Sequence, residues 1–166
     1  MADVARDPDV EGPVQAEIFV VWLDDNHQLE LTGPCAAAPW YVELGAADHP
    51  LAVVERMARN ALGKQPKLVH STSWRRDRDA VILSFVVVID AADVGAMHSV
   101  AIGRATLARS EATAAPVQIA HTQVVEHGLR HLAWLAQDDP VVSRELSRAW
   151  REVLASYVPE PFRNLG

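Results

Sequence analysis

The feature that most constrains the fold is an apolar run in the middle of the chain. From Ala80 to Ile89 every residue except Ser84 is apolar, so a strand here is hydrophobic on both of its faces. Such a strand has to be covered by protein on both sides, as in a sheet that lies between helices. The run is too short to cross a bilayer as a helix. We therefore predict a central strand over 81–89 in a layered fold.

Strand and helix patterns alternate around this central run. Segments rich in β-branched and aromatic residues, or with apolar residues at every second position, predict strands over 17–23, 28–32, 40–44 and 67–74. A further strand is expected within 98–107. Helical periodicity predicts helices over 50–62, 122–136 and 140–158. This order predicts a mixed α/β (α+β) fold, in which helices sandwich the sheet and two of them lie at the C-terminus.

The helix predicted over 50–62 carries signals at both ends. Asp48 is the expected N-cap, and Pro50 suits the first turn, where its missing N–H would be unpaired anyway. Gly63 is the expected residue just beyond the last turn. Apolar residues at i, i+3, i+7 and i+11 are expected to face the sheet. These residues are Leu51, Val54, Ala58 and Leu62.

Weaker signals mark the remaining segments. Arg75–Asp79 is predicted to be a charged turn and Ser110–Pro116 a loop. Asp139 is the expected N-cap of the last helix. That helix is expected to bury one apolar stripe, made of Val142, Leu146, Trp150, Val153 and Tyr157.

Composition narrows the class of protein. The 166 residues fit one domain, predicted over 15–166, after a disordered tail over 1–14. A formal net charge of -7 disfavours a nucleic-acid partner, because contacts to the phosphate backbone need a basic patch. Neither a signal peptide nor a membrane span is expected. Cys35 is the single cysteine and cannot form an internal disulfide, so we expect a cytoplasmic protein.

The segment Gly45–Gly63, GAADHPLAVVERMARNALG, suggests a lineage. Arg56 is followed seven residues later by Gly63, and Ala58 holds a small apolar position between them. Asp48 stands upstream as an acid. This frame resembles the Nudix (MutT-like) box of pyrophosphate-cleaving hydrolases, whose helix reads R-E-apolar-x-E-E-x-G. The resemblance extends over the order of elements in 17–89 and implies a Nudix-like mixed sheet. The glycine position of the box is offset, because Gly45 stands three residues from its expected place.

The box lacks the carboxylates that its usual chemistry requires. Met57, Asn60 and Ala61 stand where the resemblance implies metal-binding glutamates. Mg²⁺ prefers several hard oxygen ligands, and carboxylates also offset its charge. A neutral amide at Asn60 offsets none of that charge, and the side chains of Met57 and Ala61 offer no such ligand. A plain amphipathic helix with an accidental Arg-to-Gly spacing remains an alternative.

The favoured hypothesis is therefore a non-hydrolytic Nudix-like domain. It would bind a small, possibly nucleotide-like ligand or a protein partner, with no cofactor. The resemblance implies a ligand pocket between the sheet and the box helix. Arg56 and Asn60 are the box residues expected to contact the ligand, and Trp40 and Trp74 are candidate stacking walls.

Two other function classes remain open. The first is a Mg²⁺- or Mn²⁺-dependent Nudix-type hydrolase of nucleoside diphosphate derivatives, with Asp48, Glu55 and Glu111 as its unusual catalytic carboxylates. Glu126 is a further candidate for a late general base. The second is a structural module that forms a homodimer through its C-terminal helices, with Trp134 and Trp150 at the contact.

Two polar clusters have simpler interpretations. His127 and His131, near His121, are spaced i, i+4 and share a helix face, as two zinc ligands would. The inverted zincin motif needs a glutamate where Arg130 stands, so a partly exposed helix surface is preferred.

The second cluster is the arginine group Arg75, Arg76 and Arg78. Its guanidinium groups could receive a phosphate. Asp77 and Asp79 are interleaved with them and nearly balance the charge, so a solvated hairpin tip is preferred.

Overall fold

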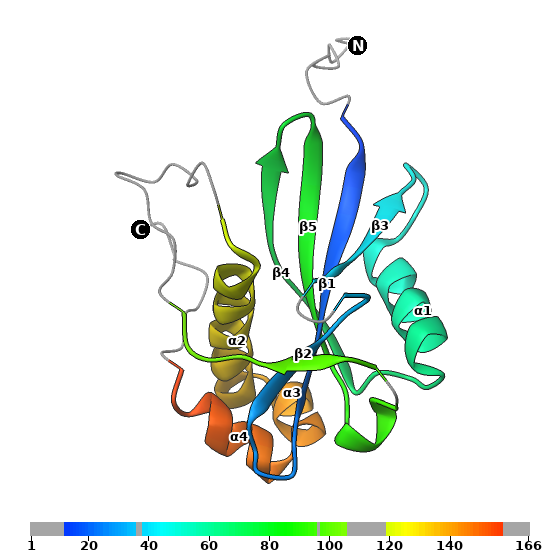
Figure 1. Cartoon of the computed structure of the whole chain (residues 1–166). Helices are drawn as coiled ribbons and strands as arrows, with labels where there is room; N and C mark the ends of the chain where they lie inside the picture. Colours follow the sequence, from blue (N-terminus) through cyan, green and yellow to red (C-terminus); the bar gives the residue numbers. More distant parts are fainter. Residues whose placement is uncertain (1–11, 36–37, 96, 106–118, 158–166) are drawn as a thin grey trace, which may run out of the picture.

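A computed structural model describes residues 12–35, 38–95, 97–105 and 119–157. Within these ranges six strands form one mixed sheet in the order β4-β5-β1-β2-β6, and β3 pairs with β1 (Figure 1). The strands are β1 (Val14–Leu23), β2 (Leu29–Thr32), β3 (Trp40–Leu44), β4 (Leu68–Asp77), β5 (Ala80–Val88) and β6 (Ser99–Ala101). The helices are α1 (Pro50–Leu62), α2 (His121–Asp138), α3 (Pro140–Glu145) and α4 (Arg148–Leu154). The mixed α/β class predicted from the sequence is confirmed.

The centre of the sheet is the parallel pair of β1 and β5. Eight residues of each strand pair, from Val14 opposite Val81 to Val21 opposite Val88. The other edge of β1 is divided, because β3 pairs with its first half and β2 with its second half, both antiparallel. On the far side, β4 pairs antiparallel with β5. The apolar run over 80–89 thus forms an interior strand, as predicted.

Each face of the sheet has its own hydrophobic core, because side chains alternate along the strands. On one face α1 packs against a cluster that includes Ile18, Val54 and Phe85. On the other face α2, α3 and α4 cover a cluster that includes Phe19 and Leu132. Figure 1 shows α1 and α2 on opposite sides of the sheet. The sheet therefore lies between two helical layers.

Helix α1 has the predicted bounds but a different buried stripe. Gly63 ends it at φ 71°, in the left-handed region that favours glycine. Val53 and Val54 are buried and Met57 packs against the same core, whereas Leu51 is exposed. The predicted stripe is therefore wrong only at Leu51, since Val54, Ala58 and Leu62 do face the core.

The predicted cap of α1 is wrong as well. His49, and not Asp48, holds the N-cap position, and its side chain makes no capping hydrogen bond. The carboxylate of Asp48 instead accepts a hydrogen bond from the backbone N–H of Gly45 at 2.7 Å. Asp48 therefore closes the turn before the helix, because Asp side chains bond readily to nearby backbone donors.

The charged segment after β4 also differs from its prediction. β4 continues to Asp77, and the turn is confined to Arg78 and Asp79. Arg75 therefore lies inside a strand and not at a solvated hairpin tip. The strand expected within 98–107 is confirmed only at 99–101. The predicted loop over 110–116 lies outside the described residues.

The last predicted helix is two helices. The chain becomes extended at Leu146 (ψ 128°), and Ser147 then caps α4 by accepting a hydrogen bond from the backbone N–H of Trp150 at 3.3 Å. A serine side chain that bonds to a nearby backbone N–H competes with helical hydrogen bonds, so it favours the start of a second helix here. The predicted cap Asp139 is confirmed, since its carboxylate accepts bonds from Val141 and Val142. The stripe is also confirmed in outline, with Val153 only partly buried.

The first strand begins within the predicted N-terminal tail. β1 begins at Val14, the last residue of the predicted tail, and residues 1–11 lie outside the described residues. Among the helices that the structure describes, none has the length and apolar character needed to cross a membrane.

Gly128 allows α2 to lie close to the sheet. A Cβ at this position would stand 2.5 Å from Val86 Cγ2 and 3.1 Å from Thr72 Cγ2. Val86 is fully buried, and its branched side chain has little rotamer freedom. A larger residue would therefore have to push the helix away from β4 and β5.

We expect Gly128→Ala to lower the free energy of unfolding, measured by urea denaturation. Overpacking costs about 1–3 kcal/mol, which equals or exceeds the gain of about 1 kcal/mol in helix propensity. Gly103→Ala is the control, because nothing lies within 4 Å of its Cβ position. A stability equal to or above that of the unaltered protein for Gly128→Ala would contradict the close contact.

Candidate functional site

The residues of the predicted box do not converge on a cleft. Met57 packs into the core between α1 and the sheet, while Arg56, Asn60 and Ala61 are exposed. The interface between α1 and the sheet is filled by apolar side chains that include Val54. The two box residues proposed to contact a ligand, Arg56 and Asn60, thus share the solvent side of the helix.

The two predicted stacking walls are far apart. Trp40 and Trp74 lie on the same face of the sheet as α1, because they are in register with Ile18 and Leu83. Trp40 is on β3 and Trp74 on β4, with β1 and β5 between them. Three strand spacings of about 4.8 Å separate these strands, roughly 14 Å in all. Trp40 packs against the core, and Trp74 is 69% exposed.

Two of the three predicted carboxylates lie among the described residues. Asp48 is engaged in its own turn, and Glu55 is partly exposed on α1. Glu111 lies outside the described residues. In the described ranges of the chain, no three His, Cys, Asp or Glu side chains are placed so that they could hold a metal ion together.

A buried polar network crosses the other face of the sheet. Glu17 on β1 is fully buried, and both of its carboxylate oxygens accept hydrogen bonds from the guanidinium of Arg75 on β4. Ser84, on the strand between them, donates to Glu17 at 2.6 Å. Tyr41 on β3 borders the carboxylate on its other side. Its pKa is raised, first by burial and then by the charge of Glu17. The hydroxyl of Tyr41 reaches His121 Nε2 at 3.2 Å.

Glu126 forms a second buried network on α2. Its carboxylate is bonded by Arg104 at 2.8 and 3.1 Å, by Arg130 at 3.0 Å and by the backbone N–H of Ala105 at 3.1 Å. Arg104 also stacks over the ring of Tyr157, 3.9 Å from its centroid. Glu126 was a candidate general base from the sequence, but its carboxylate is already bonded to Arg104, Arg130 and the backbone of Ala105.

The histidines of α2 do not act as one group. The ring centroids of His127 and His131 lie 4.7 Å apart with the ring planes tilted by 50°, and His70 of β4 approaches His131 at 5.9 Å. His131 is buried, so the predicted partly exposed helix surface is wrong for this residue. Burial lowers the pKa of His70. His121 lies apart, with its ring against Phe19.

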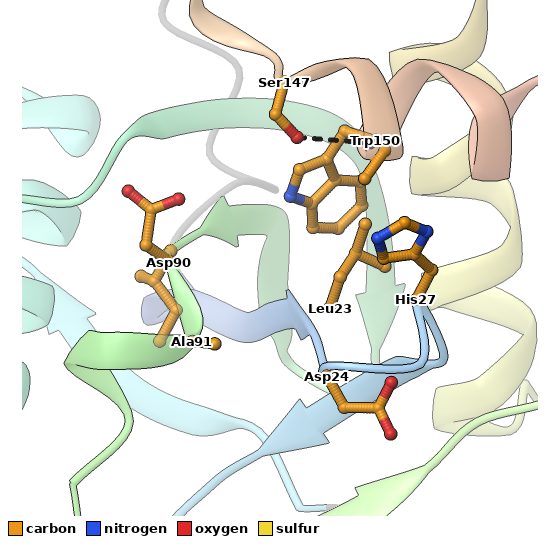
Figure 2. A pocket seen from close by; sticks show the side chains of 9 residues that line it. Leu23, Asp24, His27, Asp90, Ala91, Ser147 and Trp150 are labelled. Atoms are coloured by element: carbon orange, nitrogen blue, oxygen red, sulfur yellow. Dashed lines mark hydrogen bonds between the residues drawn. The ribbon is translucent and has the colours of Figure 1, made fainter.

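One pocket among the described residues lies where the two central strands end. Its volume is about 180 Å³. It is lined from three places: the end of β1 with its following turn, the end of β5 with the short 3-10 helix η2 (Ala91–Asp93), and the start of α4 (Figure 2). The lining residues are Leu23, Asp24, His27, Ile89, Asp90, Ala91, Ser147, Ala149 and Trp150. In sheets with parallel strands, ligands bind characteristically beyond the carboxyl ends of those strands.

The polar groups that line this pocket differ in their hydrogen bonds to the rest of the protein. The carboxylate of Asp24 accepts two backbone hydrogen bonds within its own turn, at 2.7 and 2.9 Å. One oxygen of Asp90 accepts a bond from Lys67 at 2.6 Å. Trp150 is only 2% exposed, and its backbone N–H bonds to Ser147. Its indole N–H has no hydrogen-bond partner among the residues that the structure describes, and it lies on the side of the ring that faces Asp90 (Figure 2).

This pocket was not predicted from the sequence. No site role was assigned to Asp24 or His27, and Trp150 was placed in the apolar stripe of the last helix and at a possible homodimer contact. His27 has φ 60°, which is uncommon outside glycine, but turns tolerate it. Trp150 is a core residue of its own chain, so it does not present its ring to a second copy.

Comparison with known proteins assigns no family to this fold and pocket. No family model matches the chain, and no curated protein matches it.

Proposed function

We propose that this chain is a Nudix-like domain that binds a small polar ligand and does not cleave phosphoanhydrides. The ligand would occupy the pocket at the carboxyl ends of β1 and β5, without a bound metal ion. The proposal places the protein in the cytoplasm, where the exposed thiol of Cys35 stays reduced.

The observation that carries the proposal is the indole N–H of Trp150. An indole N–H can only donate, so it pairs with any acceptor that enters the space in front of it. Trp150 is 2% exposed, and its indole N–H faces the pocket without a protein acceptor in the described ranges. A ligand oxygen in the pocket would supply that acceptor.

The absence of hydrolysis is supported by the side chains at the box positions. Met57 is part of the core, and Ala61 has no polar atom to offer. Asn60 is exposed and neutral. Asp48 is held by the turn before α1. The strand, turn and helix over 40–63 follow one another as the Nudix resemblance requires, which supports the proposed lineage.

Ligand binding is tested by the melting temperature against a panel of small amines, alcohols, carboxylates, nucleosides and nucleoside diphosphates. We expect at least one compound to raise it, since a ligand at 100 times its Kd adds about 2.7 kcal/mol of stability. Ala91→Leu, which narrows the pocket, is expected to abolish the rise. Ala92→Leu is the matched control, because Ala92 is an exposed neighbour outside the lining. A rise that survives in Ala91→Leu, or no rise with any compound, would contradict the proposal.

The absence of catalysis is tested separately by phosphate release. With the nucleoside diphosphate panel and Mg²⁺ or Mn²⁺, we expect no release above the background without protein. Metal-dependent turnover that is lost in Asp48→Asn, Glu55→Gln or Glu111→Gln would overturn the proposal in favour of a hydrolase.

A further inference from the structure

The pocket at the ends of β1 and β5 also indicates the chemical class of its ligand. We infer that it selects a small protonated amine that carries a hydroxyl or carbonyl oxygen close to the nitrogen. The ligand oxygen accepts from the indole N–H of Trp150, and the ammonium donates to Asp90. This inference rests on the proposed ligand-binding function and adds the charge and the polar groups of the ligand.

The indole requires an acceptor in the ligand. An indole N–H only donates, so a group that pairs with it has to bring a lone pair. Among the described residues, the hydroxyl of Ser147 accepts from the backbone N–H of Trp150 and not from its indole. In Figure 2 Asp90 lies across from the indole nitrogen, with Ala91 beside it. A small molecule with an acceptor for the indole N–H and a donor for the carboxylate of Asp90 would therefore match the pocket.

The carboxylates require a donor and favour a positive charge. Asp24 and Asp90 bring two negative charges to the lining, and Lys67 pairs with one of them. Counted over Asp24, Asp90 and Lys67, one negative charge remains. Asp90 uses one oxygen for Lys67, and a carboxylate has about four acceptor sites, so it can accept from a second ammonium. A cation neutralises this pocket, whereas an anion would add to the repulsion.

The volume of the pocket and the side chains available around it narrow the class of ligand further. At about 180 Å³ the pocket is smaller than the roughly 300–1,000 Å³ typical of sites for drug-sized ligands. A molecule of a few heavy atoms, or one end of a longer molecule, fits this space. Within the described ranges no trio of His, Cys, Asp or Glu side chains is arranged to hold a metal ion, which favours an organic cation over a divalent metal.

Three probes of similar size test the class: ethanolamine, ethylene glycol and glycolate. Titrations are followed by the indole N–H signals in the two-dimensional ¹H–¹⁵N spectrum, with Trp150 assigned from the Trp150→Phe variant. We expect ethanolamine to shift the Trp150 signal saturably, with an apparent Kd at least tenfold below that of either other probe. The indole N–H of Trp22 is the internal reference, because it is buried, has no partner among the described residues and lies outside the pocket.

Two charge variants separate the site from the overall charge of the protein. Asp90→Asn is expected to weaken ethanolamine binding about tenfold or more, since a hydrogen bond to a charged group contributes that much. Asp25→Asn removes the same charge from the neighbouring turn, outside the lining, and is expected to leave Kd within twofold. Both positions are exposed, so both variants should fold.

The outcomes distinguish this inference from the proposed function. Binding of glycolate or ethylene glycol at the Trp150 signal, as tight as that of ethanolamine, overturns the amine class and leaves the ligand pocket standing. Equal effects of Asp90→Asn and Asp25→Asn also overturn it. If none of the three probes shifts Trp150 while a compound of the wider panel raises the melting temperature, the class is wrong and the function stands. If no compound of either set acts, both are wrong.

Discussion

Replacing Arg75 with methionine is expected to lower the free energy of unfolding by about 3–5 kcal/mol, because it leaves a buried carboxylate without its cation. Glu17 is fully buried, and Arg75 binds both of its oxygens. Ser84 would remain as a donor at 2.6 Å, but a hydroxyl brings no charge. Urea denaturation at neutral pH measures the loss.

A double variant tests the cause of this loss. Glu17→Gln combined with Arg75→Met removes both charges, and we expect it to be more stable than Arg75→Met alone, because an uncompensated buried charge is the dominant cost. Arg144→Met is the control, since its ion pair with Glu145 is exposed and should contribute less than about 1 kcal/mol. Equal losses for Arg75→Met and Arg144→Met would show that Glu17 and Arg75 are not coupled.

The same pair shows where sequence analysis stops. Arg75 was assigned to a charged turn from the composition of its neighbours, and its role depends on Glu17, which is 58 residues away. The sequence did contain one indication of a buried ion pair, because the charged Glu17 stands beside the apolar segment 18–23 of an interior strand. The identity of its partner follows only from the order in which β4, β5 and β1 pair. That order is set by tertiary packing and not by local propensity.

Local signals were sufficient for the boundaries of α1 and the existence of the central strand. Pro50 and Gly63 set the ends of the helix through their own backbone geometry. The run over 81–89 is so apolar that its composition alone predicts its burial. The pocket could not be found in this way. The pocket forms because β1 and β5 pair in parallel, and because the chain breaks its helix before Ser147, which places Trp150 in the pocket lining. The Nudix lineage and the ligand remain predictions.

The second large effect is expected at Glu126, whose carboxylate joins Arg104, Arg130 and the backbone of Ala105. Glu126→Gln keeps the shape of the side chain but removes its charge. We expect it to lower the free energy of unfolding at pH 7 by about 3 kcal/mol, because two guanidinium groups lose a carboxylate that is itself only 2% exposed. Glu145→Gln, at an exposed carboxylate, is the control and should change stability by less than about 1 kcal/mol.

The pH dependence of this variant identifies the charge as the cause. Burial alone would raise the pKa of Glu126, but the hydrogen bonds from Arg104, Ala105 and Arg130 outweigh it, so its pKa in the folded protein lies below the ordinary value of 4.5. A carboxylate with a lowered pKa contributes its full stabilisation above the unfolded value and loses it as the pH falls through the folded value. The stability difference between the unaltered protein and Glu126→Gln should therefore be constant above about pH 5.5 and shrink progressively below pH 4.5. Denaturation curves recorded from pH 7 to pH 3 measure this difference. A difference that stays constant down to pH 3 would mean that the shape of the network, and not its charge, holds Arg104 and α2 together.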